Sequence, residues 1–312
     1  MTRGLVICVA LLLARVAHAD PQKIDVGVYV NNISQLDIKT SQFTVDFYVW
    51  FRWEGGGTEL NPLETFELPN GRITSKTGVS KRSVGLQRYA SCRVLATITK
   101  VFDMTRFPLD DHTLTVEIED SDSDTRVAEL VPDTENATVR PDLVVPGWEV
   151  IASRSKVITY TYRTNYGDIT LPHGRKSSYS RYIFSIGIER PGYGRFLRVF
   201  FGLFISALIS WCAFHVRPKE SSPRVSLGIG ATFAAAAVTV AINNSLPDTN
   251  SVTMADQLIM LTLGVIVSSV IVTIVALALA ARGKDAAQRK LDKVCSIAFP
   301  IAYLALLVYI IS

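Results

Sequence analysis

The sequence contains few of the residues from which metal centres and catalytic sites are built. Four histidines and four cysteines occur among its 312 residues. None of the histidines has a cysteine or acidic partner at the spacing of a metal site; they are His18, His112, His173 and His215. The sequence shows no nucleophile with a neighbouring base either. It therefore predicts a protein that is not an enzyme and that uses no metal or cofactor.

Paired cysteines and strong charge are also lacking. Cys212 and Cys295 lie in long apolar segments, and Cys92 is predicted to be a small packed residue. A disulfide framework is therefore not expected. The formal net charge of +4 is modest and is not gathered into a basic patch. This distribution argues against nucleic acid as a partner.

A short acidic run resembles the opening of a calcium-binding loop without completing it. Residues 120–124 read DSDSD. Thr125 stands where the sharp turn of an EF-hand needs glycine, and Val131 stands where its bidentate glutamate belongs. An EF-hand is therefore excluded, which leaves a solvated acidic loop or a weak divalent site.

The first 19 residues have the organisation of a secretory signal peptide. A positive charge at Arg3 precedes an apolar run over residues 5–13, and Ala17 and Ala19 form a small-x-small cleavage site. The apolar run is shorter than the ~20 residues that a membrane-spanning helix needs. The mature chain is expected to begin at Asp20 and to be exported.

Residues 20–192 show the period-two alternation of β-strands. Apolar and more polar side chains alternate between residues 43 and 51, and the pattern recurs over 94–98, 114–118 and 182–188. Turn signals containing glycine or proline separate these runs. No helix-period pattern of any length interrupts them. An all-β, immunoglobulin-like sandwich is therefore predicted for this domain.

Residues 193–312 contain four apolar stretches, predicted as helices at about 196–216, 224–246, 253–281 and 294–311. Each is near the ~20 residues that cross a bilayer, so an all-α four-helix transmembrane domain is expected. Basic residues occupy the loops after the first and third stretches; they are Arg217, Lys219, Arg224, Arg282, Lys284, Arg289, Lys290 and Lys293. Because basic loops stay in the cytoplasm, the sandwich and the C-terminus are both expected outside.

The second apolar stretch differs from the others because it is rich in small and hydroxyl-bearing residues. Alternating steps of four and three residues place six side chains on one helical face. These are Ser226, Gly230, Phe233, Ala237, Val240 and Asn244. Such a face suits a water-filled lumen with an apolar constriction or a close-packed seam between helices. The segment alone does not decide between the two.

Residues 102–110 carry the most specific resemblance to a known family. They read FDMTRFPLD, which resembles the loop at the membrane end of the sandwich in bacterial pentameric ligand-gated ion channels, relatives of the Cys-loop receptors without the disulfide. Also similar are Trp53, Arg190, Leu246-Pro247 and Ala298-Phe299-Pro300. Two features depart from the family: Gly202 stands where proline is common, and residues 54–93 are short for two of the ligand loops.

The resemblance implies a homopentamer in a bacterial inner membrane, in contact with lipids, with its sandwich in the periplasm. A small extracellular agonist would open it, and ions would pass between five copies of the second helix. Five Phe233 rings would then form a hydrophobic gate. Charge selectivity stays open, because Pro223 points to anions and Glu220 points to cations.

The agonist is expected to bind between neighbouring subunits. The resemblance matches its ligand loops to Glu67, Glu119, Asp120, Ser121, Tyr166 and Tyr179. Tyr48, Ser91 and Arg93 are expected to face them from the next subunit. Rings and carboxylates together favour a cation, so the leading prediction is a primary amine. The alternatives are proton gating through the acids and His112, and a non-conducting sensor or binding protein whose helices only anchor it.

Coupling between the two domains is expected where the sandwich meets the helices. The family arrangement places there Asp37, Lys39, Phe107, Pro108, Asp110, Arg190, Leu246 and Pro247. Asp110 and Arg190 have opposite charges and are expected to meet at this junction.

Overall fold

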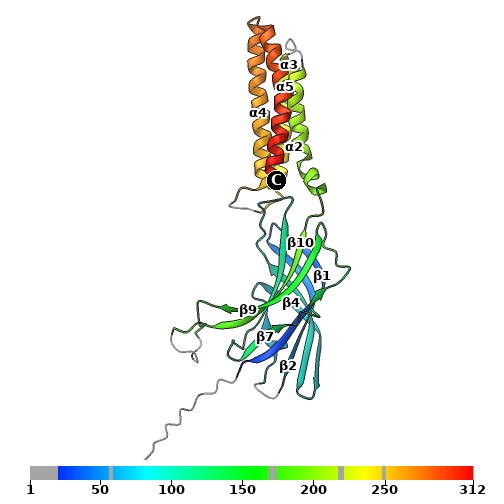
Figure 1. Cartoon of the computed structure of the whole chain (residues 1–312), viewed down its shortest axis with the longest axis vertical. Coiled ribbons are helices and arrows are strands. Elements are labelled where there is room, and N and C mark those ends of the chain that lie inside the picture. The colour runs from blue at the N-terminus through cyan, green and yellow to red at the C-terminus, as the bar shows by residue number, and fades with distance from the viewer. Residues whose placement is uncertain are drawn as a thin grey trace, which may run out of the picture.

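The computed structural model describes residues 20–55, 59–167, 169, 174–216, 221–247 and 251–311. The molecule is elongated, with strands at one end and a bundle of long helices at the other (Figure 1). The predicted signal peptide, residues 1–19, lies outside the described residues.

Two sheets make up the strand-rich part. The first has the order β4 (Gly71–Val84), β5 (Gln87–Thr99), β2 (Gln42–Glu54), β1 (Gln22–Asp37) and β7 (Ala128–Pro132), and β8 (Thr138–Val139) also pairs with β1. The second has the order β3 (Phe66–Glu67), β6 (Asp111–Asp120), β10 (Ser178–Glu189) and β9 (Glu149–Thr161). One helical turn, α1 (Pro62–Thr65), precedes β3.

The alternation seen in the sequence becomes the apolar core of this domain. Phe43, Val45, Phe47, Val49 and Phe51 on β2 are at most 1% exposed, because successive side chains of a strand point to opposite faces. Alternate residues of β5, β6 and β10 are buried in the same way. The predicted fold class of a β-sandwich followed by four helices is confirmed.

The four long helices are α2 (Gly194–Cys212), α3 (Ser221–Asn243), α4 (Met254–Ala281) and α5 (Asp285–Ile311), and a 3-10 turn at Ala213–His215 extends α2. All four are long and apolar enough to cross a membrane. α4 begins with a capping box, in which Thr253 and Asp256 each bond to the other's backbone N–H.

The last helix begins nine residues earlier than predicted, at Asp285 rather than at 294. The prediction followed hydropathy, which ends where the charged residues begin. The structure extends the helix because its first turns are amphipathic: Gln288 and Asp292 are buried against the bundle, whereas Arg289, Lys290 and Lys293 are not. The first helix also differs from the prediction, because its regular α-helical part ends at Cys212 instead of at 216.

The two domains are joined by hydrogen bonds as well as by the chain itself. The Thr105 carbonyl accepts a hydrogen bond from the Met254 backbone N–H at the start of α4, at 2.7 Å. Lys39 Nζ, in the turn between β1 and β2, donates to the Asn244 carbonyl after α3, at 3.4 Å. The loop of residues 102–110 and the turn after β1 therefore contact the ends of the helices that face the sandwich.

Small residues bring α3 close to its neighbours. A Cβ added at Gly202 of α2 would lie 2.5 Å from a Val238 methyl of α3, and one added at Gly228 of α3 would lie 2.8 Å from a Val270 methyl of α4. Helices in a membrane associate through such close packing, because lipid offers no hydrophobic driving force between them. Gly202 thus allows α2 and α3 to approach at a position where family members often have proline.

We expect Gly202→Ala to destabilise the protein by about 1–3 kcal/mol, because the added methyl overpacks the α2–α3 contact. Gly264→Ala on α4 is the matched control, since nothing lies within 4 Å of a Cβ added there. Alanine is the better helix former by roughly 0.5–1 kcal/mol, so the control should be neutral or stabilising. Thermal unfolding in detergent measures both variants, and equal melting temperatures would contradict the close approach.

Candidate pore and ligand sites

The six residues predicted to share one face of α3 are all exposed in the subunit. Phe233, the largest of them, is 74% exposed. The opposite face is packed, and its buried residues are Arg224, Gly228, Ala231, Ala235 and Ile242. At 3.6 residues per turn the two sets lie on opposite sides of the helix. The face with Ser226, Phe233 and Asn244 is therefore turned away from the rest of the subunit's bundle.

A buried arginine occupies the centre of the predicted ligand cluster. Arg181 Nε on β10 donates to Glu119 Oε1 at 2.5 Å, and its Nη1 donates to Glu117 Oε2 at 2.8 Å. Its Nη2 donates to the Tyr162 hydroxyl at 3.0 Å. The guanidinium carbon lies 3.8 Å from the ring centre of Tyr160. Burial alone lowers the pKa of Arg181. The hydrogen bond and charge of Glu119 and the charge of Glu117 outweigh burial, so the pKa lies above its ordinary value.

Tyrosine rings surround this arginine at the end of the second sheet. Tyr162 lies edge-on to Tyr160, Tyr166 and Tyr179, at centroid distances of 4.8, 5.2 and 5.8 Å. The Tyr162 hydroxyl also donates to Glu119 Oε2 at 2.9 Å. Burial, followed by this carboxylate, raises the pKa of Tyr162. The structure thus brings the predicted Glu119, Tyr166 and Tyr179 into one cluster.

The other acids of the predicted set lie beside this cluster on neighbouring strands. Glu67 pairs with Glu119 in the β3–β6 register. Burial and the nearby Glu119 charge raise the pKa of the Glu67 carboxyl. Asp120 is buried and accepts from the Asp122 backbone N–H. The Ser121 hydroxyl donates to the Thr65 carbonyl at 2.9 Å. Both groups therefore brace the loop after β6.

Tyr48, Ser91 and Arg93 lie on the outer face of the first sheet. They alternate with buried residues of β2 and β5, and Tyr48 pairs with Arg93 in the register. Arg93 makes two hydrogen bonds to the Asp46 carboxylate, at 2.9 and 2.6 Å, and lies 5.9 Å from the Tyr48 ring centre. Because the Glu119 cluster belongs to the other sheet, one subunit does not bring the two predicted halves of the site together.

Sequence reasoning missed the residues that fill the cluster. Glu117, Tyr160, Tyr162 and Arg181 were not among the predicted ligand residues, although they make its shortest contacts. A signal was available, since Tyr160 and Tyr162 alternate along one strand, as Tyr179 and Arg181 do along the next. Period-two spacing puts each pair on one face, but the register that joins the strands is tertiary information.

A second buried cluster lies at the junction with the helices. Asp110 Oδ2 is 2.7 Å from His112 Nε2, and Asp110 Oδ1 accepts from Arg190 Nε at 3.4 Å. Arg190 also donates to the Gly147 carbonyl and lies 3.5 Å from the ring centre of Trp148. The predicted meeting of Asp110 with Arg190 is present, four residues before α2 begins.

Electrostatics within this junction cluster favour a charged Asp110. Burial alone raises the pKa of the Asp110 carboxyl, but the His112 hydrogen bond and the Arg190 charge outweigh it, so the pKa lies below its ordinary value. Burial lowers the pKa of Arg190 to about 10 against the opposing pull of Asp110. Arg190 therefore stays a cation at neutral pH, and the carboxylate is shared by two partners.

The remaining junction residues form the contact surface itself. Phe107 and Pro108 are buried, and the peptide bond between them is cis. The Asp37 carboxylate accepts from the backbone N–H groups of Lys39 and Thr40, which closes the turn between β1 and β2. Leu246 packs against the apolar core, and Pro247 is partly buried beside it.

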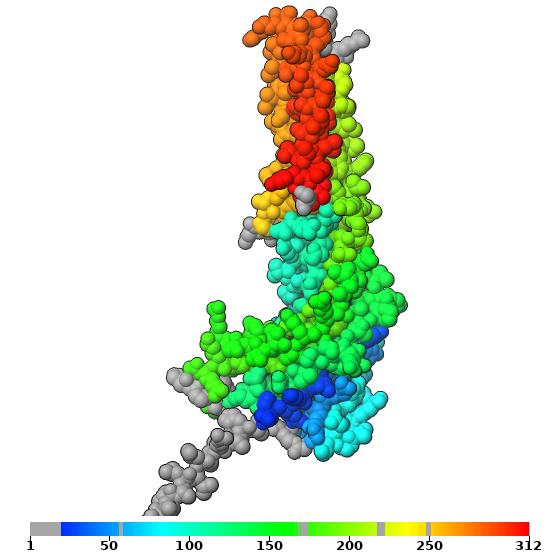
Figure 2. Space-filling model, in the orientation of Figure 1, coloured from blue at the N-terminus to red at the C-terminus, as the bar shows by residue number. Residues whose placement is uncertain are grey.

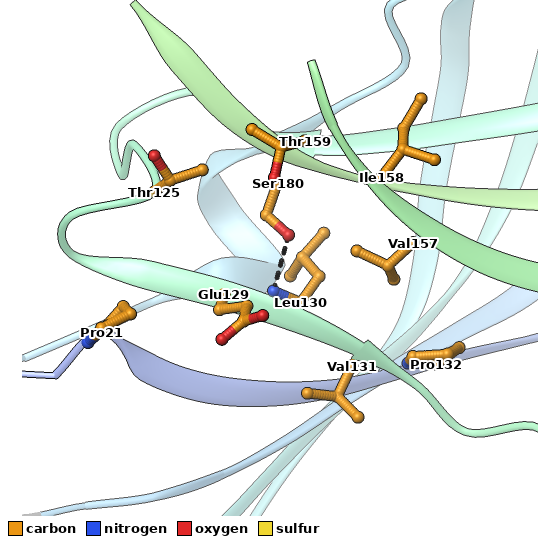
Figure 3. Close-up of a pocket in the computed structure, with 10 residues that line it drawn as sticks. All are labelled: Pro21, Thr125, Glu129, Leu130, Val131, Pro132, Val157, Ile158, Thr159 and Ser180. Atoms are coloured by element: carbon orange, nitrogen blue, oxygen red, sulfur yellow. Dashed lines mark hydrogen bonds between the residues drawn. The ribbon is translucent and has the colours of Figure 1, made fainter. Parts of the chain in front are cut away.

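A separate cavity of about 500 Å³ lies where the edges of the two sheets separate, between β7 and β9 (Figure 3). Among the described residues that line it, Glu129 has the only charged side chain, and the Ser180 hydroxyl oxygen accepts from the Leu130 backbone N–H at 2.9 Å. None of the predicted ligand residues lines it. The cavity is therefore distinct from the Arg181 cluster.

No family model matches the chain. A curated relative, described as a proton-gated ion channel of Gloeobacter violaceus, is 21% identical over 304 residues, which cover 91% of this chain and 81% of the relative. Together with the four apolar helices, this match supports a multi-pass membrane protein that is not an enzyme. The resemblance of this chain to the bacterial pentameric ligand-gated ion channels is thus confirmed, both by its fold and by a relative that matches nearly its whole length.

Proposed function

We propose that five identical copies of this chain form a ligand-gated ion channel whose pore is lined by α3. The observation that carries the proposal is the face of α3 with Ser226, Phe233 and Asn244, which is exposed along its whole length while the opposite face is packed. A helix that only anchored the sandwich would have no use for a small, hydroxyl-bearing face. Five such helices around one axis would enclose a path for water and ions.

Phe233 is the proposed gate of this pore. It is the only aromatic residue of α3, and it lies near the middle of the helix on the exposed face. A ring of five phenyl groups stops ions by dewetting without contacting them. Ala237 and Val240 extend the apolar zone outward, and Ser226 and Gly230 line the inner end.

The proposed orientation follows from charge. The basic loops after α2 and α4 lie in the cytoplasm, and the sandwich lies in the periplasm after removal of residues 1–19. The chain would then reside in a bacterial inner membrane with its C-terminus outside. Glu220, which the sequence connected with ion selectivity, lies outside the described residues.

We expect single cysteines at 226, 230, 233, 237, 240 and 244 to react with water-soluble thiol reagents and to alter the current. Cysteines at 227, 231 and 238 are the controls, because these positions are buried or half-buried on the other side of α3. Current across a bilayer, recorded before and after the reagent, measures the effect. Reactivity without a helical period would refute the choice of helix or of face, and a wild-type protein without current would favour the anchored sensor.

The agonist site is proposed between the outer face of one subunit's first sheet and the Arg181 cluster of its neighbour. Its two halves lie on different sheets of each subunit, so only an adjacent copy can bring them together. Tyr48, Ser91 and Arg93 would come from one subunit and Glu67, Glu119, Tyr166 and Tyr179 from the next. Asp120 and Ser121 would hold the loop that borders the second half.

A primary amine is the first candidate agonist. The tyrosine rings and acids of the cluster have the chemistry that binds an ammonium group. Arg181 already occupies that environment in the subunit. It donates to one Glu119 oxygen and lies over the Tyr160 ring, and its partner Tyr162 donates to the other Glu119 oxygen. An amine would therefore compete with Arg181 for Glu119, which makes Arg181 a determinant of amine affinity.

Protons are the second candidate agonist, favoured by the buried His112–Asp110 contact and by the proton gating of the relative. His112 faces the rings of Phe102 and Trp148, at centroid distances of 5.0 and 5.2 Å, and its charged neighbours are Asp110, with Arg190 beyond it, and Asp103. A proton on His112 adds positive charge that competes with Arg190 for one carboxylate. Acidification would then loosen Arg190, just before α2 begins.

One experiment separates the two candidates. Amines are applied at constant pH, and the pH is stepped from about 7 to about 5, where histidine titrates, with no amine present. For an amine agonist, Glu119→Gln should lower the apparent affinity roughly tenfold through the lost charge, and Arg181→Gln should raise it by freeing Glu119. For protons, His112→Asn should remove the response to acid. Glu129→Gln, an exposed acid of β7, is the control in both arms.

Each candidate agonist has a result that would contradict it. Amine responses that are identical in wild type, Glu119→Gln, Tyr166→Ala and Tyr179→Ala would place an amine site elsewhere. An acid response that persists unchanged in His112→Asn would remove the junction cluster from proton sensing.

Coupling is proposed to pass through the Asp110–Arg190 pair. The pair is buried at the junction, next to the loop contact between Thr105 and Met254. A signal passes between distant sites through a structural element that has two arrangements and whose equilibrium both sites shift. The contact of Lys39 with the Asn244 carbonyl would move with it.

We expect Asp110→Asn and Arg190→Gln to bind agonist yet to open rarely, because each removes a charge from a buried pair and leaves the other uncompensated. Open probability at saturating agonist and pentamer assembly by size-exclusion chromatography are the measurements. Asp111→Asn, an exposed carboxylate next to Asp110 in the chain, is the matched control. Failure of both junction variants to assemble would assign the pair to folding, and normal gating in assembled variants would exclude it from coupling.

A further inference from the structure

A fully buried arginine stands at the cytoplasmic end of the proposed pore helix. Arg224, in the first turn of α3, is 0% exposed. Its Nη1 donates to Asp292 Oδ2 at 2.9 Å, and its Nη2 also bonds to the same carboxylate. The Gln288 side-chain amide donates to Asp292 as well. Asp292 and Gln288 both belong to α5 and are themselves buried.

Arg224 is on the packed side of α3 and not on the proposed pore side. It precedes Ser226 by two residues, and two residues turn an α-helix by about 200°. The same packed side continues through Gly228, Ala231 and Ala235. The Arg224 side chain therefore leaves α3 on the side opposite Ser226 and reaches α5.

The acidic partner is supplied by the helix least enclosed by the bundle. α5 packs mainly against α4, and most of its surface is open at the edge of the bundle (Figure 2). The Arg224–Asp292 bridge is a direct polar link from this outer helix to α3. A buried bidentate pair fixes geometry, because removing one partner leaves an uncompensated charge.

We infer that Asp292 and Gln288 withdraw the charge of Arg224 from the inner mouth of the pore, which makes Asp292 a determinant of ion selectivity although it lies on α5. The inference rests on the proposed role of α3 as the pore helix. Five arginines facing the lumen would form a ring that favours anions. Residues 225–247 contain no charged side chain, so with Arg224 held aside the pore face of α3 is uncharged.

Ion selectivity of three variants tests the inference: Arg224→Gln, Asp292→Asn and the double variant. Reversal potentials in a KCl gradient give the ratio of chloride to potassium permeability. Arg224→Gln and the double variant should keep the wild-type ratio, because the removed charge did not face the lumen. Asp292→Asn should raise the ratio several-fold, because it releases Arg224. Asp285→Asn, an exposed acid at the start of α5, should leave the ratio unchanged.

A lower chloride-to-potassium ratio in Arg224→Gln or in the double variant would overturn the inference, since it would place Arg224 in the lumen. The double variant keeps the test decisive if a single variant fails to fold, because two amides replace the buried charges with similar shapes.

Thermal unfolding of the same purified variants tests the bridge without any current. Each single variant should melt about 5 °C or more below wild type, and the double variant should melt higher than either single variant, since it leaves no buried charge unpaired. Additive losses would overturn the bridge. A wild-type protein without current would refute the proposed channel function. The melting temperatures of wild type and the three variants would then test only whether the Arg224–Asp292 bridge exists.

Discussion

The packing of α3 on only one of its sides is the constraint on which the rest of this molecule depends. Gly202, Gly228 and the alanines of α3 let its backbone approach α2 and α4 closely, and van der Waals contact of this kind is what joins helices in a membrane. The side chains of the opposite face, from Ser226 to Asn244, are exposed in the subunit. In the proposed channel this small, hydroxyl-bearing face is turned toward water.

Three buried arginine–carboxylate pairs lie along the long axis of the molecule. Arg181 with Glu119 lies in the sandwich, Arg190 with Asp110 at the junction, and Arg224 with Asp292 at the end of the helices remote from the sandwich (Figure 1). Buried ion pairs contribute little net stability, because desolvation offsets the attraction, yet breaking one is costly. Their common effect is to fix the position of one segment against another: β10 against β6, the start of α2 against the sandwich, and α3 against α5.

The junction pair differs from the other two because a histidine, His112, shares its carboxylate with the arginine. His112 and Arg190 contact different oxygens of Asp110. Arg181 donates hydrogen bonds to Glu119, Glu117 and Tyr162, and Arg224 makes a bidentate contact with Asp292. Both arrangements suit a fixed structure. A shared carboxylate suits a contact with two arrangements, as required of an element that transmits a signal between domains.

The amino-acid sequence determined the elements of this protein and the faces that they present. Period-two alternation in residues 43–51 and the four- and three-residue steps from Ser226 to Asn244 are local properties, so the core side of β2 and the shared face of those α3 residues were predictable, whereas the open state of that face was not. The FPLD motif likewise indicated the junction and the partner of Arg190. The tertiary structure alone decided which distant charges meet. Strand register places Arg181 between Glu117 and Glu119, and helix packing places Asp292 against Arg224, at the amphipathic start of α5 that hydropathy had left outside the helix. Hydrophobic patterning reports which side of an element is buried, but the partner of a buried charge depends on how separate elements are aligned.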